Sequence, residues 1–238
     1  MQKQKLTDQF FLAIQATYDN FEIGLFNQTT CIDTVQEDKT RVSKDFISFL
    51  ESLLRRNQVN LEKINFIAVN QGPGLFSALR SVIVSANGLN FACQIPLIGI
   101  DGLKALLSEY TNPDFPITVA LLNAFNKEVY YGIEHNDEII YAGYNTISAV
   151  LDMIHSRYPG DMIRFIGNGT ELYRANISAQ FSDNVFIPDS LPQAVSIEHI
   201  GVLSLQKWSQ QEISNQLFPL YLKQHPVQIA LEKKTVDF

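Results

Sequence analysis

One segment, from Ile64 to Ile100, constrains the fold more than any other part of the sequence. It opens on the apolar run Phe66–Val69, which is long enough for a buried strand and too short for a helix. A Gly-Pro-Gly turn follows at 72–74, and a second short apolar run occupies Leu97–Ile100. Because a helix-length stretch separates the two runs, the segment predicts a βαβ unit, whose two strands pair in a parallel sheet.

The helix expected between these strands spans Phe76 to Cys93, and the Ser77 hydroxyl is expected to cap its first turn. A helical projection gives it two faces. The apolar face, which would cover the sheet, consists of Leu79, Val82, Ile83, Ala86, Leu89 and Cys93. The opposite face consists of the small residues Ser77, Ser81, Ser85, Gly88 and Ala92. Small residues allow another helix to approach closely, and that helix belongs either to the same chain or to a partner.

A second helix is expected from Ser43 to Asn57, with an apolar arc wider than one helix-on-sheet contact usually needs. Its apolar residues are Phe46, Ile47, Phe49, Leu50, Leu53 and Leu54. Part of the arc is therefore expected to contact something other than its own sheet. If the two helices are adjacent, they leave an apolar groove, which predicts a protein interface. We assign to this interface Phe46, Leu50, Leu53, Ser77, Ser81, Ser85, Gly88 and Ala92.

Four motifs occur in order along the chain. QGPGLFSALR at 71–80 contains Gly72, Pro73, Gly74 and Arg80, and it is followed by LLNAFNKEVYYGI at 121–133, FIGNGTELYR at 165–174 and PLYLK at 219–223. Together they resemble the TsaB (YeaZ) family, the non-catalytic partner in the bacterial system that makes threonylcarbamoyladenosine (t6A) in tRNA. The sequence departs from the family pattern at Val42, Lys44 and Gln71.

The resemblance implies an α/β protein with the actin-like or Hsp70-like ATPase (ASKHA) fold, whose two lobes each have a mixed β-sheet flanked by helices. The first lobe is expected over residues 1–110, with the Gly-Pro-Gly turn and the interface helices, and a smaller degenerate lobe over 111–238. The implied function is a scaffold that activates a TsaD-like catalytic subunit for t6A synthesis. A TsaE-like ATPase is a further expected partner. When the chain is alone, it is expected to pair with a second copy of itself. It is expected to meet tRNA only through the complex.

Two amides stand where related ATPases place carboxylates. In those enzymes an acidic residue follows the first strand of each lobe and holds the Mg²⁺ of the nucleotide. Here the two positions are Gln15 and Asn123. A neutral amide does not stabilise Mg²⁺ as a carboxylate does, so we expect no turnover by the lone chain and no cofactor. Nucleotide is expected only in complex with partners, if at all. The alternative for each residue is that it merely ends its strand.

Other catalytic arrangements find little support in the sequence. The histidines, His135, His155, His199 and His225, include no pair four residues apart, so local spacing predicts no metal site. Cys31 and Cys93 are expected to be buried free thiols. The alternative function is a divergent ATPase or a peptidase-like enzyme of the same fold, which would use groups that these patterns do not reveal.

Composition restricts the environment of the chain. Its net charge is -7 and its pI is about 5.1, so it lacks the basic excess of a protein that grips nucleic acid alone. The apolar run Phe10–Ile14 is too short for a signal peptide or a membrane span. We therefore expect a soluble cytoplasmic protein that makes no membrane contact.

The remaining elements are read from short apolar or alternating runs. Strands are expected at 10–14, 21–26, 29–36, 117–122, 128–134, 138–144 and 162–166. Helices are expected at 147–155 and, as a last short helix capped at 168–170, up to Arg174.

Overall fold

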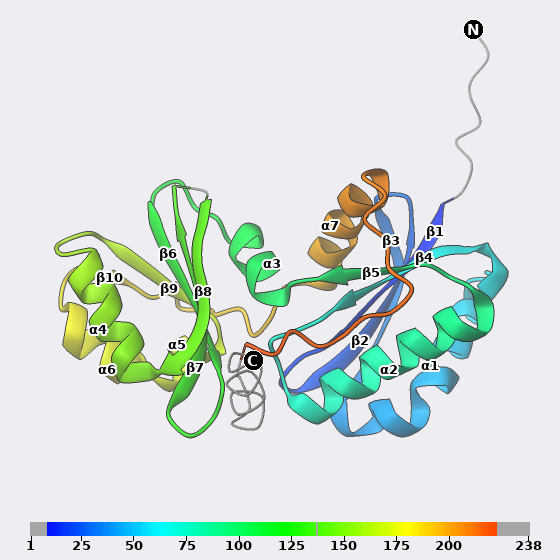
Figure 1. Ribbon diagram of the computed structural model, residues 1–238, viewed down its shortest axis with the longest axis horizontal. Helices are drawn as coiled ribbons and strands as arrows, with labels where there is room; N and C mark the ends of the chain where they lie inside the picture. The colour runs from blue at the N-terminus through cyan, green and yellow to red at the C-terminus, as the bar shows by residue number, and fades with distance from the viewer. Residues whose placement is uncertain (1–8, 137, 223–238) are drawn as a thin grey trace, which may run out of the picture.

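The computed structural model describes residues 9–136 and 138–222 and contains two lobes, each built on a five-stranded sheet (Figure 1). The first sheet has the strand order β3-β2-β1-β4-β5 and the second has the order β10-β9-β6-β7-β8. Both sheets combine parallel and antiparallel neighbours. The expected two-lobed α/β architecture is confirmed.

The first lobe begins with an antiparallel meander, β1 (Phe10–Ala16), β2 (Asn20–Asn27) and β3 (Thr30–Asp38). Short 3-10 turns at Lys39–Arg41 and Leu61–Lys63 flank helix α1 (Val42–Arg56). The predicted βαβ unit follows as β4 (Ile64–Asn70), α2 (Phe76–Cys93) and β5 (Leu97–Ile100), and β4 is parallel to both β1 and β5. Helix α3 (Gly102–Glu109) then leads to the second lobe.

The predicted bounds of α2 are confirmed, but the predicted cap is wrong. The residue before the helix is Leu75, in an extended conformation, and no side chain caps the first turn. Ser77 already lies inside the helix, where its carbonyl accepts a hydrogen bond from the Ser81 hydroxyl at 3.0 Å. The helix follows the Gly-Pro-Gly turn closely and starts two residues earlier than a Ser77 cap would allow.

The second lobe repeats the order of strands before helices. It contains β6 (Ile117–Asn123), β7 (Glu128–His135), β8 (Glu138–Thr146), α4 (Ile147–Arg157), β9 (Ile163–Ile166), α5 (Asn168–Leu172), α6 (Arg174–Phe181) and β10 (Val185–Phe186). The expectation of a last short helix ending at Arg174 is wrong, because Arg174 begins α6 and a further helix, α7 (Ile197–Ser209), follows.

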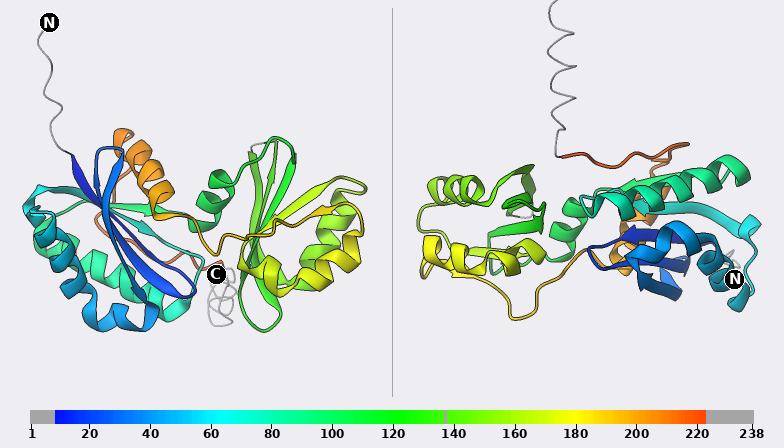
Figure 2. Two further views of the ribbon diagram at one scale, coloured as in Figure 1. Left: turned by 180° about the vertical axis from the view of Figure 1, so that it is seen from behind. Right: turned by 90° about the horizontal axis from the view of Figure 1, so that it is seen from below.

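Helix α7 returns to the first lobe, as Figures 1 and 2 show. It packs on β1, β2, β4 and β5, and Gly201 lets the helix approach the Phe26 ring so closely that an added Cβ would lie 2.5 Å from it. Ser196 caps the helix by accepting from the His199 amide at 3.0 Å, and its own amide donates to Glu109 at the end of α3 (2.8 Å). The expected second lobe, residues 111–238, includes α7, whereas α7 packs on the first sheet. We propose instead that residues 195–222 belong to the first lobe.

The segment after α7 runs as an extended strap along the first lobe (Figure 1). Ser214 and Leu97 form a β-bridge. The Asn87 side chain binds both main-chain groups of Leu217 at 2.9 Å, and the Leu220 amide donates to the Gln71 carbonyl at 2.9 Å. We call residues 213–222 the C-terminal strap.

Three groups of buried side chains form the core. One lies between the first sheet and helices α1 and α2, and another lies inside the second lobe. The third joins α3 and α7 to both sheets and contains the stacked rings of Phe11, Phe66 and Trp208, with centroids 4.5 and 4.8 Å apart. Because burying one large apolar side chain stabilises by about 1.5–3 kcal/mol, this shared group holds the lobes together.

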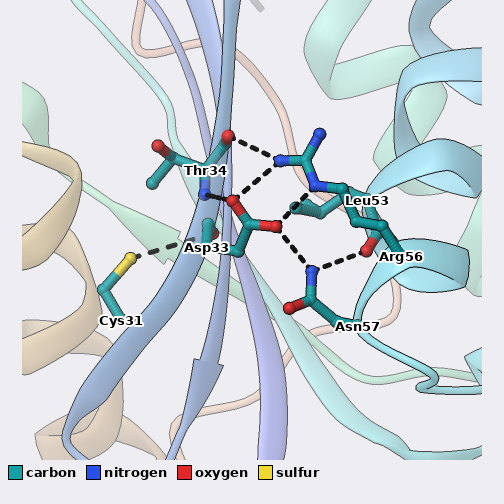
Figure 3. Close-up of polar contacts among 6 residues, drawn as sticks. All are labelled: Cys31, Asp33, Thr34, Leu53, Arg56 and Asn57. Carbon is teal, nitrogen blue, oxygen red and sulfur yellow. Dashed lines mark hydrogen bonds and ion pairs between the residues drawn. The ribbon is translucent and has the colours of Figure 1, made fainter.

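Helix α1 is tied to β3 by the carboxylate of Asp33 (Figure 3). Arg56 donates to both of its oxygens at 2.5 and 2.8 Å, and the Asn57 side chain donates to it at 2.6 Å. The Arg56 guanidinium also reaches the Thr34 carbonyl at 2.8 Å. These bonds favour the ionised carboxyl and lower the pKa of Asp33 to about 2.

Candidate functional site

Helices α1 and α2 lie side by side on the same face of the first sheet (Figure 1). As predicted, Leu79, Val82, Ile83, Ala86 and Leu89 are buried, but Cys93 is exposed because it lies on the last residue of the helix. Of the small residues, Ser77, Gly88 and Ala92 are exposed, and Ser81 and Ser85 are half-buried. An added Cβ at Gly88 would meet nothing within 4 Å. No helix among the described residues therefore covers this position of the small face.

Three residues assigned to the interface lie in the core instead. Phe46, Leu50 and Leu53 are 3%, 3% and 0% exposed and pack against the first sheet and α2. The wide apolar arc of α1 is thus mostly used by two intramolecular neighbours, a sheet and a helix. Its exposed apolar member is Ile47, at 58%.

Helix α2 also exposes apolar residues that were not among those predicted for the interface. Phe76, Val84 and Phe91 are 50%, 68% and 84% exposed. Helical spacing could have shown that Val84 and Phe91 lie beside the small residues, at positions four before and three after Gly88. A hollow of about 640 Å³ lies along α1 and the segment 58–62, with Ile47 and Leu54 in its wall and Leu89 as the contribution of α2. Helix α2 therefore presents exposed apolar residues beside its small face, and α1 borders a hollow.

The Gly-Pro-Gly turn and Arg80 shape one end of α2. Gly72 has a φ of +97°, which only glycine adopts at little cost, and its amide donates to the Asn70 side chain at 2.9 Å. The Arg80 guanidinium lies 3.7 Å from the centre of the Phe76 ring and donates to the Tyr221 hydroxyl at 2.9 Å. Gln71, a departure from the family pattern, donates to the Phe218 carbonyl at 2.7 Å. Both side chains bind the C-terminal strap.

Gln15 lies at the end of β1 and is 1% exposed. Its Nε2 donates to Glu22 at 2.6 Å and to the Val195 carbonyl at 3.0 Å, and its Oε1 accepts from Asn70 at 3.2 Å. The pKa of Glu22 is raised, mainly because the carboxyl is buried. The amide is thus used in bonds inside the first lobe.

Asn123 ends β6, and its surroundings connect the lobes. Its amide donates to Asn168 at 2.9 Å, its Oδ1 accepts from the Phe125 amide at 2.8 Å, and its carbonyl accepts from the Tyr18 hydroxyl at 2.7 Å. Tyr18 belongs to the turn between β1 and β2, where the pKa of its hydroxyl is raised by burial and by Tyr130. The turn after the first strand of each lobe therefore binds the other.

The remaining nucleophiles and metal ligands form no recognisable centre. Within residues 9–136 and 138–222, no group of three or more His, Cys, Asp or Glu residues could hold a metal ion. Cys31 is half-buried, and burial raises the pKa of its thiol to about 11. His199 binds the Ser108 hydroxyl at 2.8 Å, a contact that sequence spacing did not reveal, but Ser108 also bonds the Ala105 carbonyl at 3.0 Å. His225 lies outside the described residues.

Comparison with known proteins identifies the family. Residues 39–231 match the family described as "TsaD: tRNA N6-adenosine threonylcarbamoyltransferase". The tRNA threonylcarbamoyladenosine biosynthesis protein TsaB of Buchnera aphidicola subsp. Baizongia pistaciae is 22% identical over 90% of this chain and 97% of its own. TsaB of Buchnera aphidicola subsp. Schizaphis graminum is 24% identical over 58% of this chain and 67% of its own. The chain belongs to the TsaD family, on its TsaB (YeaZ) branch.

The solved structures agree on the fold of this TsaB-branch chain. A crystal structure described as an uncharacterized protein with similarity to peptidase YEAZ from Pseudomonas aeruginosa has a TM-score of 0.71 and 20% identity, over 90% of this chain and 100% of that one. The fold is the actin-like, Hsp70-like ASKHA fold that the motifs implied. In the described part of the chain, no helix is both long and apolar enough to cross a membrane.

Proposed function

We propose that the chain is a non-catalytic subunit in t6A biosynthesis, which binds a TsaD-like catalytic subunit through the surface of α1 and α2. The observation that carries this proposal is the exposed apolar surface of α2, above all Phe91 at 84%. Exposed aromatic anchors beside small residues are typical of helix-to-helix interfaces. The TsaB names of the curated relatives supply the process.

The interface that we propose differs from the one expected from sequence. Its small residues are Ser77, Ser81, Ser85, Gly88 and Ala92, and its apolar residues are Ile47, Val84, Leu89 and Phe91. Phe46, Leu50 and Leu53 support the surface from below. A TsaE-like ATPase is proposed to join the complex, and a second copy of the chain to occupy the same surface when the partner is absent.

The non-catalytic role is supported by the two amides at the strand ends. Gln15 makes three hydrogen bonds inside the first lobe, and Asn123 is held by Asn168 and Tyr18. Neither residue can supply the negative charge that holds Mg²⁺. We also propose that the chain works in the cytoplasm and meets tRNA only through the complex, because a net charge of -7 disfavours unaided binding to phosphates.

The decisive experiment is association with the TsaD-like protein of the same genome, measured by size exclusion with light scattering. Gly88→Arg places a long charged side chain on the small face without an intramolecular clash, because an added Cβ there meets nothing within 4 Å. Replacing this glycine inside a helix should not lower the free energy of unfolding, and should raise it by up to about 1 kcal/mol. We expect a folded variant that no longer associates.

Val202→Arg is the matched control, because Val202 is 46% exposed on α7, away from the proposed surface. It should associate as the parent chain does. If Gly88→Arg and Phe91→Ser both bind the partner with the affinity of the parent, the surface is not the interface. A steady release of phosphate from ATP by the lone chain, abolished by Gln15→Ala, would instead favour the divergent enzyme.

A further inference from the structure

A cavity of about 210 Å³ lies between the lobes, separate from the surface of α1 and α2 proposed for the partner. The first lobe contributes the Gly-Pro-Gly turn and Phe76, and the second contributes Asn123, Phe125 and Tyr130. The C-terminal strap closes one side with Tyr221. Segments far apart in the sequence thus form a single, partly open pocket beside the Tyr18–Asn123 bond.

The size of the cavity decides between two kinds of ligand. An apolar cavity of roughly 150 Å³ accepts a benzene-sized molecule, whereas sites for drug-sized ligands and cofactors measure about 300–1,000 Å³. At about 210 Å³ the space suits one mono- or bicyclic ring system and is too small for a whole nucleoside triphosphate.

The walls are chemically uniform. Four of the lining residues are aromatic, Phe76, Phe125, Tyr130 and Tyr221, and no lining residue carries a charge. Aromatic rings stack on flat ligands. A wall without charges does not compensate an ionic ligand for the water that it loses on binding. Arg80, which is outside the lining, contacts two of these rings: its guanidinium lies over Phe76 and donates to the Tyr221 hydroxyl.

The turn that presents Phe125 has an unusual backbone. Phe125, Asn126 and Lys127 have φ values of +61°, +52° and +61°, in the left-handed region that costs non-glycine residues energy. Hydrogen bonds from the Phe125 amide to Asn123 and from the Glu128 amide to the Phe125 carbonyl, both 2.8 Å, hold the turn. Phe125 is nevertheless 51% exposed, so burial of its ring is not what stabilises this conformation. Such strain is typical of ligand-binding turns.

One polar group at the wall is free to donate. The Oδ1 of Asn123 accepts from Phe125, while its Nδ2 has no acceptor among the described residues. A ring that carries a hydrogen-bond acceptor would satisfy it.

We propose that this cavity binds a free small molecule whose core is a neutral, planar heteroaromatic ring with a hydrogen-bond acceptor, of the size of a nucleobase. The ring stacks on Phe125 and accepts a hydrogen bond from Asn123. No phosphate group takes part in binding.

The test titrates the full chain with adenine as the probe, followed by ligand-observed NMR. We expect saturable binding of adenine, and ATP should bind no more tightly. Phe125→Ala should weaken adenine binding roughly five- to a hundredfold, which corresponds to the loss of one stacked ring. Gly74→Leu should abolish it by filling the space, since an added Cβ at Gly74 meets only the Ala16 carbonyl, at 3.5 Å.

Phe218→Ala is the matched control, because Phe218 is 62% exposed and lies outside the cavity. It should bind adenine as the parent does, and thermal melts should show that all variants fold. Phe125→Ala that binds adenine like the parent, or tighter binding of ATP than of adenine, would overturn the proposal. Association with the TsaD-like partner should be unchanged in Phe125→Ala, so the result stands apart from the proposed function.

Discussion

The hydroxyl of Tyr18 donates a 2.7 Å hydrogen bond to the main-chain carbonyl of Asn123, which joins the turn after the first strand of one lobe to the corresponding turn of the other. Burial raises the pKa of Tyr18, so the hydroxyl stays protonated and remains a donor across the neutral range. The two turns therefore face each other where the lobes meet.

Removing this hydroxyl should loosen the contact between the lobes. We expect Tyr18→Phe to lower the free energy of unfolding by about 1 kcal/mol, because one partly buried hydrogen bond is lost and the Asn123 carbonyl is left unpaired. Hydrogen exchange should also rise at the Phe125 amide, in the turn that Tyr18 contacts. Tyr173→Phe removes a hydroxyl with no partner among the described residues and should change neither measurement. Equal behaviour of the two variants would contradict a role for the bond.

The Asp33 network predicts a dependence of stability on pH. Its pKa falls from 3.8 to about 2 in the folded chain, so the unfolded chain binds the proton more readily. The contribution is therefore complete above about pH 4 and is lost as the pH falls toward 2. Since the pair is partly exposed, we expect Asp33→Asn to cost only about 0.5–1 kcal/mol at pH 7 and less at pH 2.5.

Urea unfolding at several pH values measures this effect. The control is Glu171→Gln, which breaks the more exposed Glu171–Arg174 pair between the end of α5 and the start of α6. It should change stability by a few tenths of a kcal/mol at most. An Asp33→Asn penalty that is the same at pH 7 and pH 2.5 would show that the ionised carboxyl is not its source.

Substitutions at two residues of α1 should distinguish its buried side from its exposed side. Leu53 is fully buried, so Leu53→Ala should lower the free energy of unfolding by about 2–5 kcal/mol. Ile47 is 58% exposed, and Ile47→Ser should change it by no more than about 0.5 kcal/mol while weakening partner association. Chemical denaturation and light scattering on the same samples test both. If Leu53→Ala is as stable as the parent chain but fails to associate, Leu53 belongs to the interface and not to the core.

The C-terminal strap should detach when its side-chain anchor is removed. Asn87 donates to and accepts from the main chain of Leu217, so Asn87→Ala leaves two main-chain groups without partners. We expect faster hydrogen exchange at Leu217 and cleavage by protease within residues 213–222. Asn145→Ala, which removes an exposed amide bonded to its next neighbour, is the control. Protection of Leu217 as in the parent chain would mean that the β-bridge at Ser214 suffices.

Much of the first lobe could be predicted from local pattern. The bounds of α2, its buried face and the parallel pairing of β4 and β5 follow from residues close together in the sequence, since apolar periodicity and a glycine turn act over one element. The four motifs likewise led to the family and its fold. Even Gln15 and Asn123 were located correctly at the ends of their strands.

The structure decided what depends on contacts between distant residues. Phe46, Leu50 and Leu53 are buried because a sheet and a neighbouring helix share their side of α1, and periodicity shows the apolar side without showing how many neighbours cover it. Likewise, no local pattern reveals that α7 and the C-terminal strap return to the first lobe, or that Tyr18 meets Asn123. The sequence by itself determined elements, faces and family. The tertiary structure alone decided which face stays exposed, because exposure depends on every segment that packs nearby.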